Sequence, residues 1–265
     1  SYELAERLTR RYSTSFSMSS RLFVSRIRPH IYAVYGMVRL ADEIVDTYRG
    51  DDVMAQLDNF EAVVYQACKQ GYSTNPIVHA FALTARKYGI ERELISLFFA
   101  SMRMDMTTAE YDEPTYRRYI YGSAEVVGLM CLKVFVEGDA AQYGKLRDGA
   151  SHLGAAYQKV NFLRDMKADY ELLGRVYFPG VDYSSFSEAS KRAIEADIAA
   201  DFALAKTNIK QLPLTIRRAV RTSMLYYEAL FRRLQNASAA DIKARRIRVP
   251  NSVKLLLFVR GAVGL

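Results

Sequence analysis

Two pairs of aspartates are the residues of this sequence whose type and spacing best suit a chemical role. Asp42 and Asp46 are four residues apart, and so are Asp165 and Asp169. On a helix, each pair would share one face as like charges, which costs stability unless a cation is shared between them. No Lys or Arg lies three or four residues from either member of the second pair, so salt bridges along the helix do not explain it. The spacing therefore favours a bound divalent metal ion.

The second pair belongs to a polar stripe along one predicted helix. At about 100° per residue, five side chains fall within an arc of about 80°: Gly154, Gln158, Asn161, Asp165 and Asp169. Apolar residues border this arc on both sides. A solvated helix face would carry Lys and Glu instead, so a polar stripe with apolar shoulders is typical of a helix that lines a cavity.

The first pair lies on a helix that we expect over residues 29–48. Tyr35 and Arg39 precede the aspartates on the same face of this helix. Here salt bridges are a serious alternative, because Arg39 can reach Asp42. This segment alone leaves the choice between a salt bridge and a binding site open. The second aspartate pair, much later in the chain, favours the site.

The candidate ligand atoms are all oxygens, which selects Mg²⁺ or Mn²⁺ over zinc or copper. Mg²⁺ usually keeps several waters and binds a few carboxylates together with substrate phosphates. Arg39 and the hydroxyls of a predicted loop over residues 12–20, Ser13 and Ser15 among them, are suited to a diphosphate, although such hydroxyls are more often helix caps. Segments rich in Tyr and Phe suggest a hydrocarbon tail behind the diphosphate, and aromatic faces also stabilise cations.

The remaining sequence predicts helices throughout. Strand-like alternation is absent, and the six prolines mostly fall at plausible helix boundaries. We therefore expect one all-α domain over residues 1–265. The predicted helices cover residues 2–12, 29–48, 52–70, 76–88, 91–109, 114–136, 139–173, 187–211, 213–236 and 240–259.

The composition limits the environment and the partners. Of the 265 residues, 50% are hydrophobic, enough for a large core, and Cys68 and Cys131 fit a reduced cytosolic compartment better than a disulfide framework. Neither a secretory signal nor an apolar run of the ~20 residues that span a bilayer is visible. The net charge of +8 at pH 7 suits diphosphates, acidic lipid surfaces or nucleic acid. No motif supports nucleic acid, and we expect none as a partner.

Taken together, these motifs resemble the squalene/phytoene synthase family. The run Asp42-Glu43-Ile-Val-Asp46 follows Tyr35 and Arg39, and the second stripe precedes Arg175-Val-Tyr-Phe-Pro179. Further motifs stand in the expected order along nearly the whole chain: Ser13-Thr-Ser15-Phe16, Tyr119-Ile-Tyr121-Gly122, Tyr226 and Arg248-Val-Pro250. Each motif is short, so the specificity of the resemblance lies in their joint order and spacing.

The resemblance implies an all-α helical bundle of the isoprenoid synthase type with a central apolar channel, and an enzyme that joins two prenyl diphosphates head to head. It implies that Arg39, Tyr121 and the four aspartates are catalytic. The implied ligands of Mg²⁺, or of Mn²⁺, are Asp42, Glu43, Asp46, Asn161, Asp165 and Asp169. The implied substrate-binding residues are Ser13, Ser15, Phe16, Tyr35, Gly128, Ala150, Gly154, Gln158, Phe162, Arg164 and Tyr226.

The reaction of this family begins with ionisation of one substrate, whose allylic cation is attacked by C2=C3 of the other. The resulting cyclopropylcarbinyl diphosphate ionises again and rearranges to a 1–1′ linked product. The run from Arg39 to Asp46 looks most like bacterial phytoene synthases, and no nucleotide-binding fingerprint argues for NADPH. The resemblance therefore favours phytoene from two geranylgeranyl diphosphates, with dehydrosqualene or squalene from farnesyl diphosphate as the alternative. Three residues depart from the usual family pattern: Thr14, Glu43 and Glu125.

A non-enzymatic, basic helical protein of the membrane surface is a more remote alternative. It would explain the positive charge and the apolar tail at 253–265, but it leaves both aspartate pairs unexplained. For the enzyme itself we expect a cytoplasmic protein, peripheral at the inner face of the cell membrane. The sequence leaves its oligomeric state open.

Overall fold

The fold is built from helices packed side by side, as seen in a computed structural model that describes residues 1–108 and 110–263, without the side chains of Thr14, Ser15 and Leu173. No strand occurs in the described part. The elements are α1 (Tyr2–Tyr12), α2 (Thr14–Ser20), α3 (Arg28–Asp46), α4 (Val53–Gln70), α5 (Pro76–Tyr88), α6 (Arg92–Thr107), α7 (Glu113–Ile120), the π-helical turn η1 (Tyr121–Glu125), α8 (Val126–Phe135), α9 (Ala140–Leu173), α10 (Glu188–Ile209), α11 (Leu214–Gln235), α12 (Ala239–Ala244) and α13 (Asn251–Val263).

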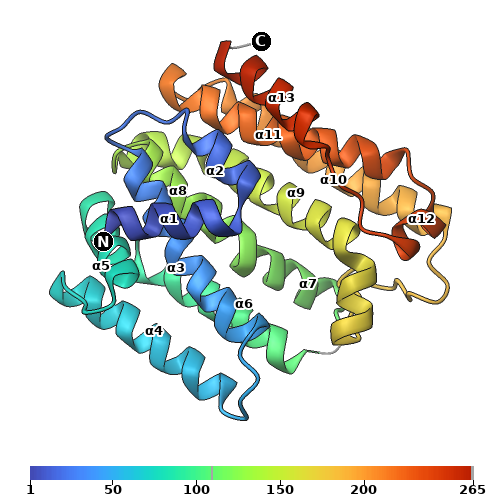
Figure 1. Cartoon of the computed structure of the whole chain (residues 1–265), viewed down its shortest axis with the longest axis horizontal. Helices are drawn as coiled ribbons and strands as arrows, with labels where there is room; N and C mark the ends of the chain where they lie inside the picture. Colours follow the sequence, from blue (N-terminus) through green and yellow to red (C-terminus); the bar gives the residue numbers. More distant parts are fainter. Residues whose placement is uncertain (109, 264–265) are drawn as a thin grey trace.

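The long helix α9 runs through the middle of the molecule (Figure 1), with α10, α11 and α13 on one side and α3 to α6 on the other. Two large groups of buried side chains follow this division. One joins α9 to α10 and α11, and the other joins α3 to α4, α5, α6 and α8. A helix that contributes to both sides is therefore the natural place for a site between them.

The ends of α9 are set by local sequence. Asp139 caps its first turn, since its Oδ1 accepts a hydrogen bond from the backbone N–H of Gln142 at 3.0 Å. Gly174 ends the helix in the left-handed region, with φ of 67°, where glycine is favoured because it has no Cβ. These two signals fix which part of the polar stripe lies inside the bundle.

Close packing against α9 depends on two glycines. A Cβ added to Gly154 would lie 2.7 Å from the carbonyl oxygen of Ala124, and one added to Gly128 would lie 2.9 Å from that of Ala150. Both distances are too short for non-bonded atoms, so η1 and α8 can approach α9 only because these residues lack a side chain.

Three predicted segments differ from the structure. Residues 14–20, predicted as a loop, form α2, whose first turn is capped by Ser13 and whose Phe16 packs against the side chains of the α9–α11 group. The single helix predicted over 240–259 is broken at 245–250, where Pro250 disfavours a helical residue before it. The predicted helix 114–136 contains the π-turn η1, a feature often found at functional sites. Within the described residues, no helix combines the length and the apolar character that crossing a bilayer requires.

Candidate active site

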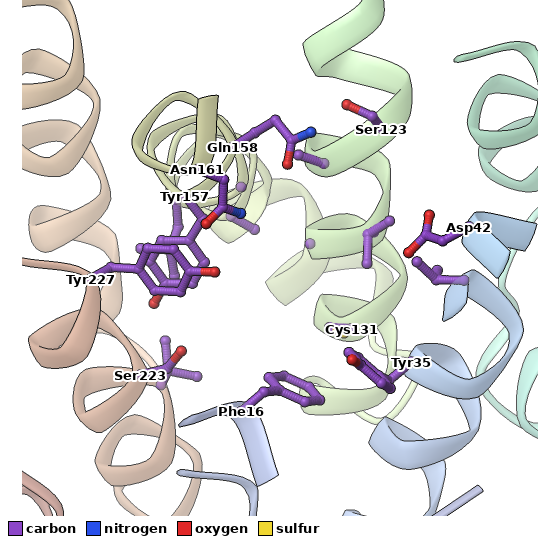
Figure 2. A pocket seen from close by; sticks show the side chains of 18 of the residues that line it. Phe16, Tyr35, Asp42, Ser123, Cys131, Tyr157, Gln158, Asn161, Ser223 and Tyr227 are labelled. Carbon is purple, nitrogen blue, oxygen red and sulfur yellow. The ribbon is translucent and has the colours of Figure 1, made fainter. Parts of the chain in front are cut away.

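A cavity of about 680 Å³ lies between the two halves of the bundle. Its walls come from α2, α3, α6, α7, α8, α9, α10, α11 and the turn η1, with further residues from the connecting segments. Figure 2 shows the open space between Tyr35 and Asp42 of α3 and Gln158 and Asn161 of α9. Both predicted aspartate pairs line this cavity, which is the arrangement that a site shared by the two stripes requires.

The carboxylates of the cavity raise one another's pKa. Burial, together with Asp46, raises the pKa of Asp42 to about 7, and burial together with Asp165 raises the pKa of Asp169 to about 7. The negative charge of Asp46 also contributes to the shift at Asp169, although the two residues lie on different helices. The two pairs therefore interact across the cavity, and their mutual repulsion favours the binding of cations there.

Arginines supply part of the compensating charge. The Nε of Arg164 donates to Oδ1 of Asp165 at 2.9 Å, and Arg246, from the segment after α12, places its Nε 2.7 Å from the same oxygen. On α3, Arg39 pairs with Glu43 and lies 3.9 Å from Asp42. The sequence pattern overlooked Arg246, because its contact with Asp165 spans 81 positions.

The oxygen atoms of the cavity fit a hydrated divalent ion better than a metal held by protein alone. Among the described residues, no group of three or more His, Cys, Asp or Glu side chains is arranged to hold one ion. Each aspartate pair would thus share an ion with waters and substrate phosphates, as Mg²⁺ prefers. The Oδ1 of Asn161 is buried without a hydrogen-bond partner, and Asn161 lines the cavity. The lone pairs of this oxygen are therefore free to coordinate a metal ion. Bound at these residues, a divalent ion would supply Lewis acidity toward a departing diphosphate.

Aromatic rings form much of the remaining wall. Phe162 and Tyr177 stack at 4.1 Å between ring centroids, and Tyr119 continues the stack 5.3 Å from Tyr177. Tyr157 of α9 and Tyr227 of α11 form a second stack in the lining, at 3.8 Å between ring centroids. These faces can both contact a hydrocarbon and stabilise a positive charge within it.

Most of the predicted site residues line the cavity. They are Phe16, Tyr35, Arg39, Asp42, Asp46, Gly128, Ala150, Gly154, Gln158, Asn161, Phe162, Arg164, Asp165 and Asp169. They come from α2, α3, α8 and α9, which the chain order alone does not place together.

Two predicted tyrosines do not line the cavity. Tyr121 packs with the side chains of the α3–α6 group, whereas Tyr119, two residues earlier, faces the cavity. Tyr226 is buried against Leu257 of α13, and its neighbour Tyr227 faces the cavity instead. Their predicted roles stay predictions. The difference in direction arises because neighbouring motif tyrosines point to different sides of a helix, and the motif does not give the rotation of the helix.

Two further predictions concern polar residues near the mouth. Ser13 is a helix cap, because its Oγ accepts a hydrogen bond from the N–H of Phe16 at 3.3 Å, and it does not line the cavity. Glu43 is outside the lining as well, in an ion pair with Arg39, so the structure does not support it as a metal ligand. The side chain of Ser15 lies outside the described residues, and its predicted role is not tested.

The cavity also contains functional candidates that the motifs did not identify. Asp105 of α6 lines it, as do Ser123 of η1 and the motif tyrosine Tyr177. A signal for Asp105 was present, since it follows Phe98 and Met102 at helical spacing and is thus a lone acid on a core-facing stripe. Its burial raises its pKa to about 6.

A helical bundle in which two aspartate stripes face each other across an apolar, aromatic cavity defines the isoprenoid synthase class of enzymes. More specifically, this chain belongs to the squalene/phytoene synthase family, whose model matches residues 9–252. The resemblance seen in the motifs is thereby confirmed, as is the all-α fold.

Individual relatives support the same assignment. The phytoene synthase of Arthrospira platensis is 25% identical over 284 residues, covering 97% of this chain and 90% of its own. The 4,4'-diapophytoene synthase of Staphylococcus haemolyticus is 25% identical over 205 residues, 76% of this chain and 70% of its own. A crystal structure of a dehydrosqualene synthase in complex with ligand has a TM-score of 0.85 at 20% identity, covering 99% of this chain and 95% of that one.

The family fixes the general activity. Its members are enzymes of the prenyltransferase type that join prenyl diphosphates head to head, and they use divalent metal ions. The predicted enzyme class is therefore confirmed for this chain.

Proposed function

We propose that this protein is a phytoene synthase, which condenses two geranylgeranyl diphosphates to phytoene and diphosphate with Mg²⁺ and without NADPH. The observation that carries the proposal is the pair of facing aspartate stripes at an apolar cavity, in a chain that aligns over 97% of its length with a phytoene synthase. The cavity wall includes the apolar side chains Leu146, Ile209 and Leu212, which suit long hydrocarbon tails.

Each part of the cavity has a task in this reaction. The guanidinium groups of Arg39, Arg164 and Arg246 are positioned to bind diphosphate oxygens, because such groups form paired, charge-assisted hydrogen bonds with them. The rings of Tyr119, Phe162 and Tyr177 line the cavity, where aromatic rings can stabilise an allylic cation. The apolar wall excludes water, which would otherwise trap the cation as an alcohol.

A synthase that uses farnesyl diphosphate is the second candidate. It is favoured by the similarity to the Staphylococcus haemolyticus enzyme and by the high TM-score with a dehydrosqualene synthase. The two candidates share every catalytic group and differ only in the length of the tail that the cavity accepts.

Product analysis separates the candidates. The protein is incubated with geranylgeranyl or farnesyl diphosphate, each with and without NADPH, and the hydrocarbons are identified by mass spectrometry. We expect phytoene from geranylgeranyl diphosphate, no effect of NADPH, loss of activity with EDTA and recovery with added Mg²⁺. Dehydrosqualene as the preferred product would replace the first candidate by the second, and a lack of any coupled product would reject both.

We also propose that the enzyme acts at the surface of an anionic membrane, through the outer face of α13. Leu255, Leu256 and Val259 are exposed on this face, and Lys254 and Arg260 on the same helix add positive charge to a chain of net charge +8. Exposed apolar side chains flanked by basic ones are suited to a bilayer surface with acidic lipids. A peripheral position at the inner face of the cell membrane would also allow a water-insoluble product to enter the bilayer directly.

Vesicle sedimentation tests this membrane contact. We expect binding to vesicles that contain phosphatidylserine and loss of most of it in Leu256→Asp. The matched control is Leu4→Asp, which changes an exposed leucine of α1 and should leave binding intact. Equal binding by wild type and Leu256→Asp, or equal loss in both variants, would rule out α13 as the docking face.

A further inference from the structure

Asp105 is a fifth carboxylate in the cavity, and its hydrogen bonds lead to aromatic rings. The hydroxyl of Tyr119 donates to both of its oxygens, at 2.7 and 2.8 Å, and the hydroxyl of Tyr177 reaches Oδ1 at 3.3 Å. Arg175 lies 3.6 Å from the same oxygen. The side chain of Asp105 is only 11% exposed, so these partners satisfy it inside the protein.

The direct contacts of Asp105 are with groups other than the proposed metal ligands, while its charge contributes to the raised pKa of Asp42 and Asp169. Its closest partners are two phenol hydroxyls and a guanidinium group. Both oxygens of Asp105 already accept a hydrogen bond from Tyr119.

The hydrogen bonds of Asp105 fix a set of rings that come from three parts of the chain. Tyr119 belongs to α7, Phe162 to α9, and Tyr177 to the segment after α9. Tyr119 and Tyr177 are nearly parallel, at 17°, and Phe162 and Tyr177 at 9°. A hydrogen bond to its hydroxyl restricts the orientation of a buried tyrosine ring, and here one carboxylate binds two of the three rings.

We propose that Asp105 is a positioning residue, which acts through Tyr119 and Tyr177 to hold the aromatic stack against the carbocation formed in the cavity. A phenol that donates to a carboxylate also gains electron density in its ring, and the attraction between a π face and a cation grows with that density. This inference rests on the proposed head-to-head condensation, because it needs a cation in the cavity.

A double-mutant cycle tests the coupling. Asp105→Asn keeps the shape but removes the charge and one acceptor, and Tyr119→Phe keeps the ring but removes the hydroxyl. We expect each variant to lower kcat by about tenfold or more, because a hydrogen bond to a charged group is lost, with little change in KM. The double variant should be about as active as the less active of the two single variants, since both changes remove the same hydrogen bond between Asp105 and Tyr119. The Mg²⁺ concentration for half-maximal activity should stay at the wild-type value.

The free energy of unfolding supplies a second cycle that does not depend on turnover. Urea unfolding of the same four proteins, without metal or substrate, should show that the effects of Asp105→Asn and Tyr119→Phe are less than additive. If the wild type makes no coupled product, the proposed function fails, while this cycle still tells whether Asp105 holds Tyr119.

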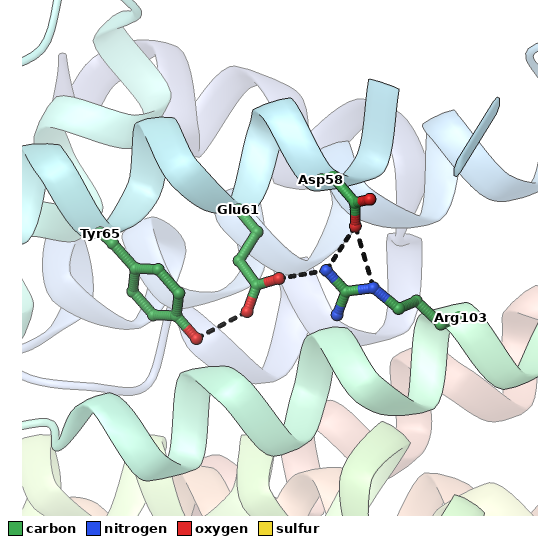
Figure 3. Close-up of polar contacts among 4 residues, drawn as sticks. All are labelled: Asp58, Glu61, Tyr65 and Arg103. Atoms are coloured by element: carbon green, nitrogen blue, oxygen red, sulfur yellow. Dashed lines mark hydrogen bonds and ion pairs between the residues drawn. The ribbon is translucent and has the colours of Figure 1, made fainter. Parts of the chain in front are cut away.

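Glu61 provides a matched control for the chemistry of the substitution. On α4, away from the cavity lining, Glu61 accepts a hydrogen bond from the hydroxyl of Tyr65 at 2.6 Å and pairs with Arg103 (Figure 3). Glu61→Gln thus weakens the same kind of tyrosine–carboxylate link and should leave kcat within about twofold of the wild type.

Three results would overturn the inference. The first is wild-type kcat in Asp105→Asn. The second is a double variant in which the two losses of kcat multiply, or the two changes in the free energy of unfolding add. Asp105 and Tyr119 would then act independently. The third is a raised Mg²⁺ requirement in Asp105→Asn, which would make Asp105 a metal ligand.

Discussion

At the scale of single residues, the cavity concentrates negative charge that the fold only partly neutralises. The pKa values of Asp42 and Asp169 are raised to about 7, because both are buried beside another carboxylate. Asp165 instead has Arg164 and Arg246 as direct partners. Groups whose charge is unfavourable in the folded protein are common where function requires them. The two aspartates of the α9 pair should therefore behave differently when they are neutralised.

We predict that Asp169→Asn stabilises the protein while removing its activity. The raised pKa means that the ionised carboxyl destabilises the fold at pH 8, so Asn should increase the free energy of unfolding there by about 1–2 kcal/mol. The gain should shrink as the pH falls through 7, where the wild-type carboxyl becomes protonated. Turnover should fall at least on the order of a hundredfold. Urea unfolding in EDTA at pH 8 and pH 6, together with product assays, measures both effects.

Asp165→Asn is the companion variant, and it should lose activity to a similar extent without gaining stability. The substitution leaves the guanidinium groups of Arg164 and Arg246 without the carboxylate that they share. If both variants were stabilised alike, the repulsion attributed to Asp169 would not be specific to its surroundings. Wild-type activity in Asp165→Asn would contradict the proposed metal role of the pair.

At the scale of helices, the site depends on how closely α9 approaches η1. Gly154 lies at this contact and also lines the cavity, so the same residue sets the packing distance and the shape of the site. The atoms that limit it are backbone atoms of Ala124 and Glu125, which cannot move without shifting the π-turn. Even one added methyl group at Gly154 should therefore lower both stability and activity.

We predict that Gly154→Ala destabilises the protein by about 1–3 kcal/mol, the usual cost of overpacking, and lowers activity. Gly144→Ala is the control on the same helix, since nothing lies within 4 Å of its added Cβ. Alanine there should raise stability by up to about 1 kcal/mol through its higher helix propensity. Thermal unfolding of both variants tests the argument, and equal shifts in Tm would show that helix propensity alone decides.

The sequence predicted the long helices and the two aspartate stripes, because both follow from a repeat along one helix. It did not predict Asp105 or Arg246 as site residues, since their roles arise from contacts between segments far apart in the chain. Glu125, left without a role by the family pattern, lies in η1, where burial raises its pKa although a hydrogen bond with Ser151 acts in the other direction. The direction of a side chain within a motif, as at Tyr226, can be determined only from the packed structure.

At the scale of the whole molecule, stability should respond to acid through two opposing contributions. The aspartates of the cavity have raised pKa values, so the native protein takes up their protons readily and their contribution to stability grows as the pH falls toward 4. His30, at the contact of α1, α3 and α5, acts in the other direction. Its pKa is lowered to about 4 by burial and by the neighbouring charge of Lys87.

The contacts of His30 explain why its neutral form is favoured. The Nε2 lies 3.5 Å from the ammonium of Lys87, which can donate to it, and the Nδ1 lies 2.9 Å from the hydroxyl of Thr84. The imidazole packs edge-on against Tyr2 and Tyr88. An added proton on Nε2 would thus face a second positive charge inside an aromatic pocket.

We predict that the acid sensitivity of the folded state depends on His30. In the unfolded chain the imidazole has a pKa near 6.5, so between pH 6.5 and 4 the unfolded state binds a proton that the native state resists. This group should therefore lower the free energy of unfolding by about 2–3 kcal/mol as the pH falls through that window, and leave it unchanged above pH 7. Comparing wild type with His30→Gln by urea unfolding at several pH values isolates this contribution, because the cavity aspartates titrate identically in both proteins. A stability difference that stays constant from pH 8 to pH 4 would mean that His30 takes up its proton equally well in both states.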